Sequence, residues 1–264
     1  MIGECTVHNS WVMSMLFLVA AVAAPTGAQA QWKTPWDYEG ARGPDHWSAL
    51  DPEYASCNTG REQSPIEILT ARLTTTPDLP ALQFAYRSYP LEGLTDNGKT
   101  IRVNYHGSQT ENVLVVNGDR YRLTQFHFHR PSEELVNGKR YDMVLHLMHA
   151  SSDGRLAGVA VFLSAGKANA TVQQLWDHMP KTVGTEESAR GVDVNPATML
   201  PRDAAYYMYS GSVTAPPCTE GVTWFVLKTP VEVSPEQIAA FARRYPHNVR
   251  PVQSLNGRVV KSTP

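Results

Sequence analysis

Two histidines, His127 and His129, are the residues of this chain whose type and spacing most directly suggest metal chemistry. They lie in an alternating run of polar and aromatic residues, Gln125-Phe126-His127-Phe128-His129. Successive side chains of an extended strand point to opposite faces of a sheet, so both imidazoles leave one face and both phenylalanine rings leave the other. Two imidazoles on one face are a possible pair of metal ligands.

A third imidazole can come from the next strand-like run, residues 143–149, which contains His146 and His149. An Asn137-Gly138 turn signal connects the two runs, so antiparallel pairing would place this run beside the first. His146 and His149 point to opposite faces of an extended strand, and only one of them can join the first pair. The alternation of residues alone does not choose between them.

Three neutral imidazoles satisfy three positions of a tetrahedral zinc ion and leave the fourth for water. That arrangement is typical of a catalytic zinc site rather than a structural one. The alternative interpretation is a set of core or surface histidines that are held by hydrogen bonds. A single His-x-His pair is weak evidence for metal, and the third candidate on the neighbouring run strengthens it.

Short β-type runs bounded by turn signals predict the strands that must position these histidines. The expected strands cover residues 82–86, 100–105, 112–116, 121–129, 143–149, 156–164 and 222–227. The turn signals between them include Asn97-Gly98, Asn117-Gly118, Asn137-Gly138 and Asp153-Gly154. Short strands joined by such turns predict a mostly antiparallel sheet.

Helical patterns are few. Residues 168–178 and 235–245 are expected to be helical, the second behind a Ser234 cap with proline at the first helical position and Gln237 at the third. Residues 32–65 are rich in Trp, Tyr, Gly and Pro and are expected to be irregular. No linker divides the chain, so we expect one α+β domain built on a large twisted, mostly antiparallel β-sheet with a few peripheral helices.

The composition is that of a folded protein and excludes several partners. Of the 264 residues, 42% are hydrophobic and 18% are charged, which is enough to form a sizeable core. A formal net charge of -2 without a long basic run argues against nucleic acid and against an anionic membrane surface as partners. The apolar residues 11–24 are too few to form a stable membrane span.

The same apolar residues precede an Ala28-Gln29-Ala30 cleavage pattern, which predicts a signal peptide over residues 1–30. The first ten residues hold no Lys or Arg, which departs from the usual signal. Cleavage after Ala30 would export a chain of residues 31–264 to the periplasm or the medium, with Cys57 and Cys218 as its only cysteines. In an oxidising compartment these two are expected to form a disulfide.

The chain resembles the α-class carbonic anhydrases of the bacterial, exported kind over nearly all of residues 31–264. The motifs that carry the resemblance are Trp36-Asp37-Tyr38, Gly43-Pro44-Asp45-His46-Trp47, Gln63-Ser64-Pro65-Ile66, Gln125-Phe126-His127-Phe128-His129, Pro131-Ser132-Glu133, His146-Leu147-Met148-His149, Tyr209-Ser210-Gly211-Ser212-Val213-Thr214-Ala215-Pro216-Pro217-Cys218 and Val222-Thr223-Trp224. They occur in the order of the family, which makes the resemblance very specific.

The resemblance implies reversible hydration of carbon dioxide to bicarbonate and a proton by attack of zinc-bound hydroxide, the activity of a zinc hydro-lyase. The implied zinc ligands are His127, His129 and His146, since the family's third ligand matches His146. His149 matches a residue on the far side of that strand. In exported relatives the disulfide is common, and a homodimer is a possible assembly.

Further site residues follow from the resemblance alone. Thr214 matches the threonine that accepts a hydrogen bond from the zinc hydroxide and donates its own proton to Glu133. Gln125 and the backbone carbonyl of Asn248 match the groups that support His127 and His129. The residues that match the apolar substrate pocket are Met148, Gly158, Val213, Val222 and Trp224.

The sequence departs from the family pattern in three places. Lys99 occupies the position of a proton-shuttling histidine, and with an ordinary pKa of about 10.4 a lysine accepts a proton poorly at neutral pH. Val144 replaces the glutamate that supports the third ligand, and Glu134 replaces a histidine, so we expect Glu134 to reach His146 instead. In the pocket, Gly158 and Met148 stand where valine is common, which changes the shape of the pocket.

Two other functions fit parts of this pattern. A non-catalytic binding domain of the same fold would lack zinc ligands, and three histidines at the ligand positions argue against it. A zinc hydrolase acting on esters would use the same metal chemistry, but the sequence shows no pocket for a larger acyl group.

Overall fold

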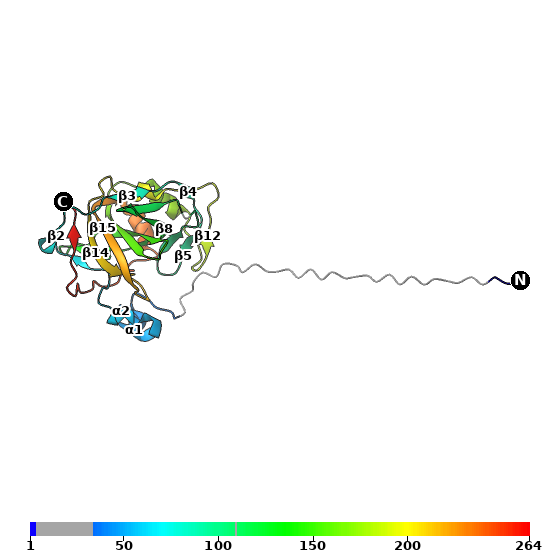
Figure 1. Cartoon of the computed structure of the whole chain (residues 1–264), viewed down its shortest axis with the longest axis horizontal. Helices are drawn as coiled ribbons and strands as arrows, with labels where there is room; N and C mark the ends of the chain where they lie inside the picture. Colours follow the sequence, from blue (N-terminus) through cyan, green and yellow to red (C-terminus); the bar gives the residue numbers. More distant parts are fainter. Residues whose placement is uncertain (4–33, 109) are drawn as a thin grey trace. The chain divides into compact units, whose positions relative to one another are not determined.

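A sheet of twelve strands, counted among the described residues, forms the frame of the structure (Figure 1). The computed structural model describes residues 1–3, 34–108 and 110–264, and the unit discussed below is residues 34–264. Apart from residues 1–3, the predicted signal peptide, with the apolar residues 11–24 and the Ala28-Gln29-Ala30 pattern, lies outside the described residues. Within the described part of the chain, no helix is long and apolar enough to cross a membrane.

Five neighbouring strands form the middle of the sheet. In spatial order they are β6 (Ile101–Asn104), β8 (Asp119–His129), β10 (Met143–Ser151), β11 (Leu156–Ala165) and β15 (Glu220–Val233). Towards one edge follow β5 (Leu94–Asp96) and β12 (Glu186–Glu187), and towards the other β14 (Tyr206–Ser212), β16 (Lys261–Ser262) and β2 (Thr74–Thr75). Figure 1 accordingly shows β12 and β2 on opposite sides of the sheet.

The remaining strands make smaller pairings. β7 (Val113–Val116) pairs with β8 and with β3 (Leu82–Ala85). Two separate pairs are β1 (Glu67–Ile68) with β9 (Leu135–Val136), and β4 (Tyr89–Pro90) with β13 (Asp193–Val194). In the main sheet the neighbours are antiparallel except for β11 with β15 and β16 with β2. The predicted mostly antiparallel sheet is therefore confirmed, with one parallel pair near its centre.

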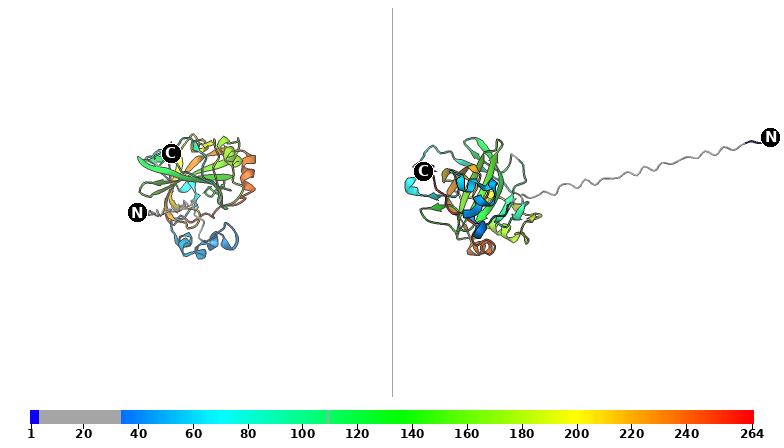
Figure 2. Two further views of the ribbon diagram at one scale, coloured as in Figure 1. Left: turned by 90° about the vertical axis from the view of Figure 1, so that its right-hand side faces the viewer. Right: turned by 90° about the horizontal axis from the view of Figure 1, so that it is seen from below.

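The four α-helices of the described chain lie around this sheet. They are α1 (Trp47–Leu50), α2 (Ser56–Thr59), α3 (Ala170–Asp177) and α4 (Pro235–Ala242). Short 3-10 helices occur at η1 (Gly40–Arg42), η2 (Pro44–His46), η3 (Pro52–Tyr54), η4 (Thr70–Arg72) and η5 (Pro196–Met199). Figure 2 shows the blue helices α1 and α2 well apart from the orange helix α4.

The two predicted helices, residues 168–178 and 235–245, are present as α3 and α4, and both are shorter than predicted. α4 starts with the expected cap, since the Ser234 hydroxyl accepts the backbone N–H of Gln237, whose side chain accepts the N–H of Ser234. α3 starts only after Asn169, whose side chain accepts two backbone N–H groups of the first turn. The expectation that residues 32–65 are irregular was wrong for residues 40–59, where proline and the Asp51 cap start single helical turns.

The two faces of the central strands pack into two different cores. Phe126 and Phe128 of β8 point into the larger core, which also contains Trp176 of α3 and Phe241 of α4. Residues of the opposite parity enter a second cluster, for example Val144 of β10. The period-2 alternation of β8 therefore buries the phenylalanine rings under the helices and leaves the histidines on the other face.

A disulfide between Cys57 of α2 and Cys218, in the loop between β14 and β15, joins two segments that are 161 residues apart. The expected pairing is thus present in the structure. Both cysteines are buried, and the backbone carbonyl of each accepts a side-chain hydrogen bond, Cys57 from Arg250 and Cys218 from Gln63.

Replacing Cys57 and Cys218 together with serine should lower the free energy of unfolding by roughly 3 to 5 kcal/mol, because the open chain regains the entropy of a long loop. Urea unfolding followed by circular dichroism measures this difference. The same loss on adding a reductant to the unaltered protein is the control, and a change below about 1 kcal/mol would contradict the loop-entropy argument.

Candidate metal centre

Three histidines lie close together near the centre of the sheet, on the face opposite to that of Phe126 and Phe128. In the antiparallel pairing of β8 with β10, His146 lies directly opposite His127, and Val144 lies opposite His129. Directly opposed residues place their side chains on the same face. Since His127 and His129 are two residues apart on one strand, all three imidazoles leave the same face, as the alternation of β8 predicted.

The three rings are close enough to share one ion. Their centroids are 4.9 Å apart for His127 and His129, 5.4 Å for His127 and His146, and 4.8 Å for His129 and His146. One ring nitrogen of each lies within 4.8 Å of those of the other two. His129 and His146 are buried, and His127 is half-buried.

One nitrogen of each ring is held from outside the cluster. His127 Nδ1 lies 2.8 Å from the side-chain oxygen of Gln125, and His129 Nδ1 lies 2.7 Å from the backbone carbonyl of Asn248. His146 Nε2 lies 3.4 Å from Glu134 Oε2. Such contacts fix the orientation of an imidazole and leave its other nitrogen for a metal.

The donor set fits a divalent metal ion. His129 Nε2 and His146 Nδ1 are buried without any hydrogen-bond partner, which is costly unless a ligand accepts their lone pairs. Burial lowers the pKa of all three histidines, for His129 to about 4, so the imidazoles are neutral as metal ligation requires. Three neutral nitrogens held this way make a metal site.

Glu133 faces this cluster from the segment that follows β8. Its Oε2 lies 3.5 Å from His129 Nε2 and 3.8 Å from His146 Nδ1 and has no hydrogen-bond partner, while Oε1 accepts the backbone N–H of Arg250 at 2.9 Å. Burial, and secondly the charge of Glu134, raise the pKa of Glu133 to about 8. The N–H of Arg250 and a hydrogen bond from Thr214 oppose this rise.

Arg250 joins the segments around the site, and no local pattern of residues indicates this role. Its guanidinium donates to the side chain of Gln63 and to the carbonyls of Ser64 and Cys57, each at 2.8 Å, and it lies 5.6 Å from the ring centre of Trp47. Burial lowers its pKa to about 10. Through its guanidinium Arg250 binds the carbonyl of Cys57, a disulfide cysteine, and through its backbone N–H it binds the carboxylate of Glu133.

Tyr38 is a second residue whose position the sequence did not predict. Its buried ring lies edge-on to the ring of His129, with centroids 6.5 Å apart. Burial, and secondly the charge of Glu133, raise the pKa of its phenol. Tyr38 belongs to one of the motifs that carry the family resemblance, and that motif is the only signal in the sequence that could have indicated its place.

The apolar residues expected to form a pocket lie beside the triad. Met148, Gly158 and Trp224 form one row across β10, β11 and β15. A side-chain carbon at Gly158 would lie 2.7 Å from the Trp224 ring, so that ring fills the space that a valine would occupy. The ring of Trp224 is 4.7 Å from that of His146. Val222 is buried in the same cluster, and Val213 is half-buried.

Lys99 and His149 have partners of their own. The Lys99 ammonium lies 3.5 Å from Asp37 Oδ1 and 5.3 Å from the ring centre of Trp36.

His149 points away from the triad, where its Nε2 lies 2.5 Å from the Tyr86 hydroxyl and its Nδ1 lies 3.3 Å from the carbonyl of Ala157. Of the two histidines that the alternation left open, the structure brings only His146 to the metal site.

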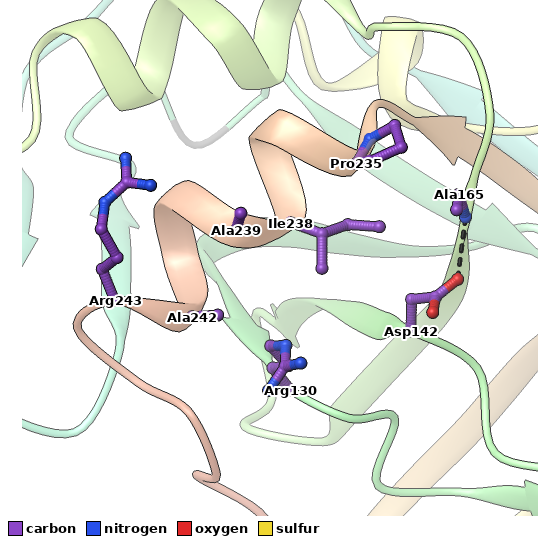
Figure 3. Close-up of a pocket in the computed structure, with 8 residues that line it drawn as sticks. All are labelled: Arg130, Asp142, Ala165, Pro235, Ile238, Ala239, Ala242 and Arg243. Atoms are coloured by element: carbon purple, nitrogen blue, oxygen red, sulfur yellow. Dashed lines mark hydrogen bonds between the residues drawn. The ribbon is translucent and has the colours of Figure 1, made fainter.

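A groove of about 480 Å³ beside α4 is separate from the metal centre (Figure 3). Apolar residues of α4 line it together with Arg130, Asp142 and Arg243. The Asp142 carboxylate accepts the backbone N–H of Ala165, and the two guanidinium groups do not converge on one point in Figure 3. The groove shares no residue with the triad.

Comparison with known proteins gives the family. A family model described as eukaryotic-type carbonic anhydrase matches residues 42–264. The carbonic anhydrase of Nostoc sp. is 41% identical over 254 residues, which cover 94% of each chain, and that of Klebsiella pneumoniae is 43% identical over 229 residues, which cover 85% of this chain and 89% of the relative.

A solved structure of the α-carbonic anhydrase from Thermovibrio ammonificans, in complex with the inhibitor sulfanilamide, superposes with a TM-score of 0.80 at 40% identity, covering 86% of this chain and 99% of that chain. The chain therefore belongs to the eukaryotic-type, or α-class, carbonic anhydrase family. Members of this family are lyases that catalyse the zinc-dependent hydration of carbon dioxide, and the chain is an enzyme of this kind.

Substitutions at His146 and His149, which are three residues apart, should have different effects on the metal content of the protein. His146→Ala removes a ligand nitrogen and should abolish retention of a divalent metal through dialysis, whereas His149→Gln should retain one metal ion per chain. Elemental analysis of the purified variants measures both. Equal metal content in the two variants would contradict the assignment of His146 to the site.

Proposed function

We propose that this chain binds zinc through His127, His129 and His146 and hydrates carbon dioxide at that ion. The observation that carries the proposal is the pair of buried, unpartnered ring nitrogens, His129 Nε2 and His146 Nδ1, beside the third ring. Three neutral imidazoles are the ligand set of a catalytic zinc site. When bound, zinc acidifies the water that it coordinates and so provides a nucleophile at neutral pH, for which this enzyme class is the standard example.

Thr214 and Glu133 would orient that nucleophile. The Thr214 hydroxyl donates its proton to Glu133, and Glu133 is fixed in turn by the backbone N–H of Arg250. A hydroxyl whose proton is committed in this way can only accept a hydrogen bond from water in the site. The threonine oxygen would therefore hold one lone pair of the nucleophile towards the substrate, which contributes by orientation.

The apolar side chains beside the triad would hold carbon dioxide. They are those of Met148, Val213, Val222 and Trp224, with Gly158 next to the Trp224 ring. The substrate is small and apolar, so it needs contact with apolar atoms and no hydrogen-bonding partner. The contact between Gly158 and the Trp224 ring supports a pocket whose floor is the indole rather than a branched aliphatic side chain.

Stopped-flow hydration of carbon dioxide, followed with a pH indicator, tests the proposed function. The zinc-loaded protein should accelerate hydration, a chelator should abolish the activity, and added zinc should restore it. Metal-free protein and zinc alone are the controls. A fully zinc-loaded protein without hydration activity would refute the proposal.

Glu134 would replace the glutamate that the family carries at the position of Val144. Its 3.4 Å contact with His146 Nε2, with both side chains fully buried, supports this exchange. Burial is the main cause that raises the pKa of Glu134, to about 7, and a cation at the imidazole would oppose that rise. Val144 itself lies in the apolar cluster, opposite His129.

Glu134→Gln should weaken zinc binding by roughly 10- to 100-fold, because the outer partner of a ligating histidine sets its orientation and basicity. Competition with a chromophoric chelator measures the affinity. The double variant Glu134→Gln with Val144→Glu should recover most of the loss, since it restores a carboxylate on the strand of His146. Unaltered zinc affinity in Glu134→Gln would exclude this role.

Lys99 would make proton export the slow step of turnover. The ammonium faces Asp37 and the Trp36 ring, and an ammonium has three N–H donors and no lone pair to accept a proton. Buffer molecules from solution would then carry the proton away.

Lys99→His should raise the turnover number at low buffer concentration and reduce its dependence on buffer, because an imidazole titrates near neutral pH. The expected gain is on the order of tenfold, below the roughly 10²- to 10⁴-fold of a positioned proton-transfer group, because buffer already carries part of the proton flow. Lys99→Gln is the matched control, which removes the charge without adding a proton acceptor and should leave the buffer dependence in place. Identical buffer dependence in Lys99→His and the unaltered protein would refute this assignment.

We propose further that the chain is exported and that residues 31–264 form the mature catalytic domain. The buried disulfide supports an oxidising compartment, the periplasm or the medium. The cleavage pattern at residues 28–30 supports removal of a signal peptide. A homodimer is the proposed assembly by analogy with exported bacterial relatives.

A further inference from the structure

Arg102 is a basic residue on the metal-binding face of the sheet that has no part in the mechanism above. It lies on β6 directly opposite His127 in the pairing of β6 with β8. The burial of β6 alternates, with Ile101 and Val103 in the core under the helices. Arg102 therefore lies on the same face as the three histidines, at the neighbouring position of the sheet.

The guanidinium of Arg102 is half-buried and not fully hydrogen-bonded. Its Nε is buried and has no hydrogen-bond partner. Burial lowers the pKa of Arg102, while the charge of Glu186 opposes this, and an arginine remains charged at any physiological pH. The positive charge of Arg102 therefore lies beside the metal site, on the residue directly opposite His127 in the sheet.

Glu186, on the edge strand β12, is a counter-charge that acts on Arg102 and also contacts other side chains. Its carboxylate accepts from Asn104 Nδ2 at 2.9 Å and lies 3.2 Å from His106 Nε2 and 3.5 Å from the hydroxyl of Thr95. The carboxylate is thus shared with other side chains, and its charge opposes the effect of burial on Arg102.

An anion in the site would lie near two buried carboxyl groups, which contact His129 and His146. Glu133 and Glu134 are both fully buried at the triad. Removing an anion from water is costly unless it is paired, so an anionic species needs positive charge near the triad. Arg102 supplies a fixed cation on the β6 side of the site, in addition to any bound metal ion.

We propose that Arg102 is the binding residue for the anionic partner of the reaction, bicarbonate, and for other small planar carboxylates. A guanidinium matches a planar oxyanion with two parallel hydrogen bonds, and the side chain of Arg102 is only half-buried on this face. Carbon dioxide is neutral and gains nothing from this group, so Arg102 distinguishes the charged species from the neutral one. The inference rests on the proposed function of the same site.

Acetate, a planar carboxylate that the enzyme cannot convert, is the probe. Its dissociation constant is measured by calorimetry at constant ionic strength on the zinc-loaded protein and on variants with confirmed zinc content. Arg102→Gln should weaken acetate binding about tenfold, the effect of one charge-assisted interaction, and Arg102→Lys should weaken it less. Glu186→Gln should tighten it by roughly two- to threefold, since it removes the opposing charge and keeps an acceptor oxygen.

Arg122→Gln is the matched control, because Arg122 is also a half-buried arginine but pairs with Val113 and Ala150, away from the triad. It should leave acetate binding unchanged. In the dehydration direction, Arg102→Gln should also raise the KM for bicarbonate. Should Arg102→Gln fail to hold zinc, Arg102→Lys and Glu186→Gln must still shift acetate affinity in opposite directions.

Unchanged acetate affinity in Arg102→Gln, or an equal loss in Arg122→Gln, overturns the inference. The result also separates it from the proposed function. An unaltered protein that hydrates carbon dioxide, with a Gln variant that binds acetate equally well, refutes the role of Arg102 alone. A protein that loses acetate affinity with Arg102→Gln but never hydrates carbon dioxide refutes the proposed function alone.

Discussion

The metal site buries ring nitrogens and a carboxylate oxygen that have no hydrogen-bond partner, and the rest of the structure depends on the free-energy cost of this burial. His129 Nε2, His146 Nδ1 and Glu133 Oε2 lie within 3.5 to 3.8 Å across the cluster, buried and without hydrogen-bond partners. Each such atom costs on the order of 1 to 3 kcal/mol, and the rings cannot rotate to relieve it because Asn248 and Glu134 hold their other nitrogens. A bound cation satisfies both nitrogens at once, so the energy of metal binding adds to the stability of the fold.

The fold maintains this arrangement by separating two environments across one sheet. The face with Phe126 and Phe128 packs against α3 and α4, which bury it in the larger core. Beside the face with the histidines, Arg250 binds the carbonyl of Cys57 with its guanidinium and the carboxylate of Glu133 with its backbone N–H. The central strands therefore determine the spacing of the ligands, while contacts distant in sequence determine their orientation. Lys99 and Arg102 place positive charges around the ligands, and Glu134 places a carboxyl group there.

The sequence predicted the parts of this structure that depend on local patterns. Alternation placed His127 and His129 on one face, and the capping residues located α4. It could not choose between His146 and His149, because that choice depends on register, and the pairing of β10 with β8 is irregular between Met148 and His149. Strand β14 was missed because its burial does not alternate. The carbonyl of Asn248 and the side chain of Arg250 reach the site across 119 and 186 residues, and such contacts leave no local signal.

The central claim is that three imidazoles hold one metal ion and that no further protein side chain completes its coordination. X-ray absorption spectroscopy at the zinc edge, on protein loaded with one equivalent of zinc, tests this directly. The account predicts three imidazole nitrogens at about 2.0 to 2.1 Å and one oxygen that exchanges for an added anion. A fourth protein ligand, such as the carboxylate of Glu133, with a spectrum that added anions do not change, would contradict it.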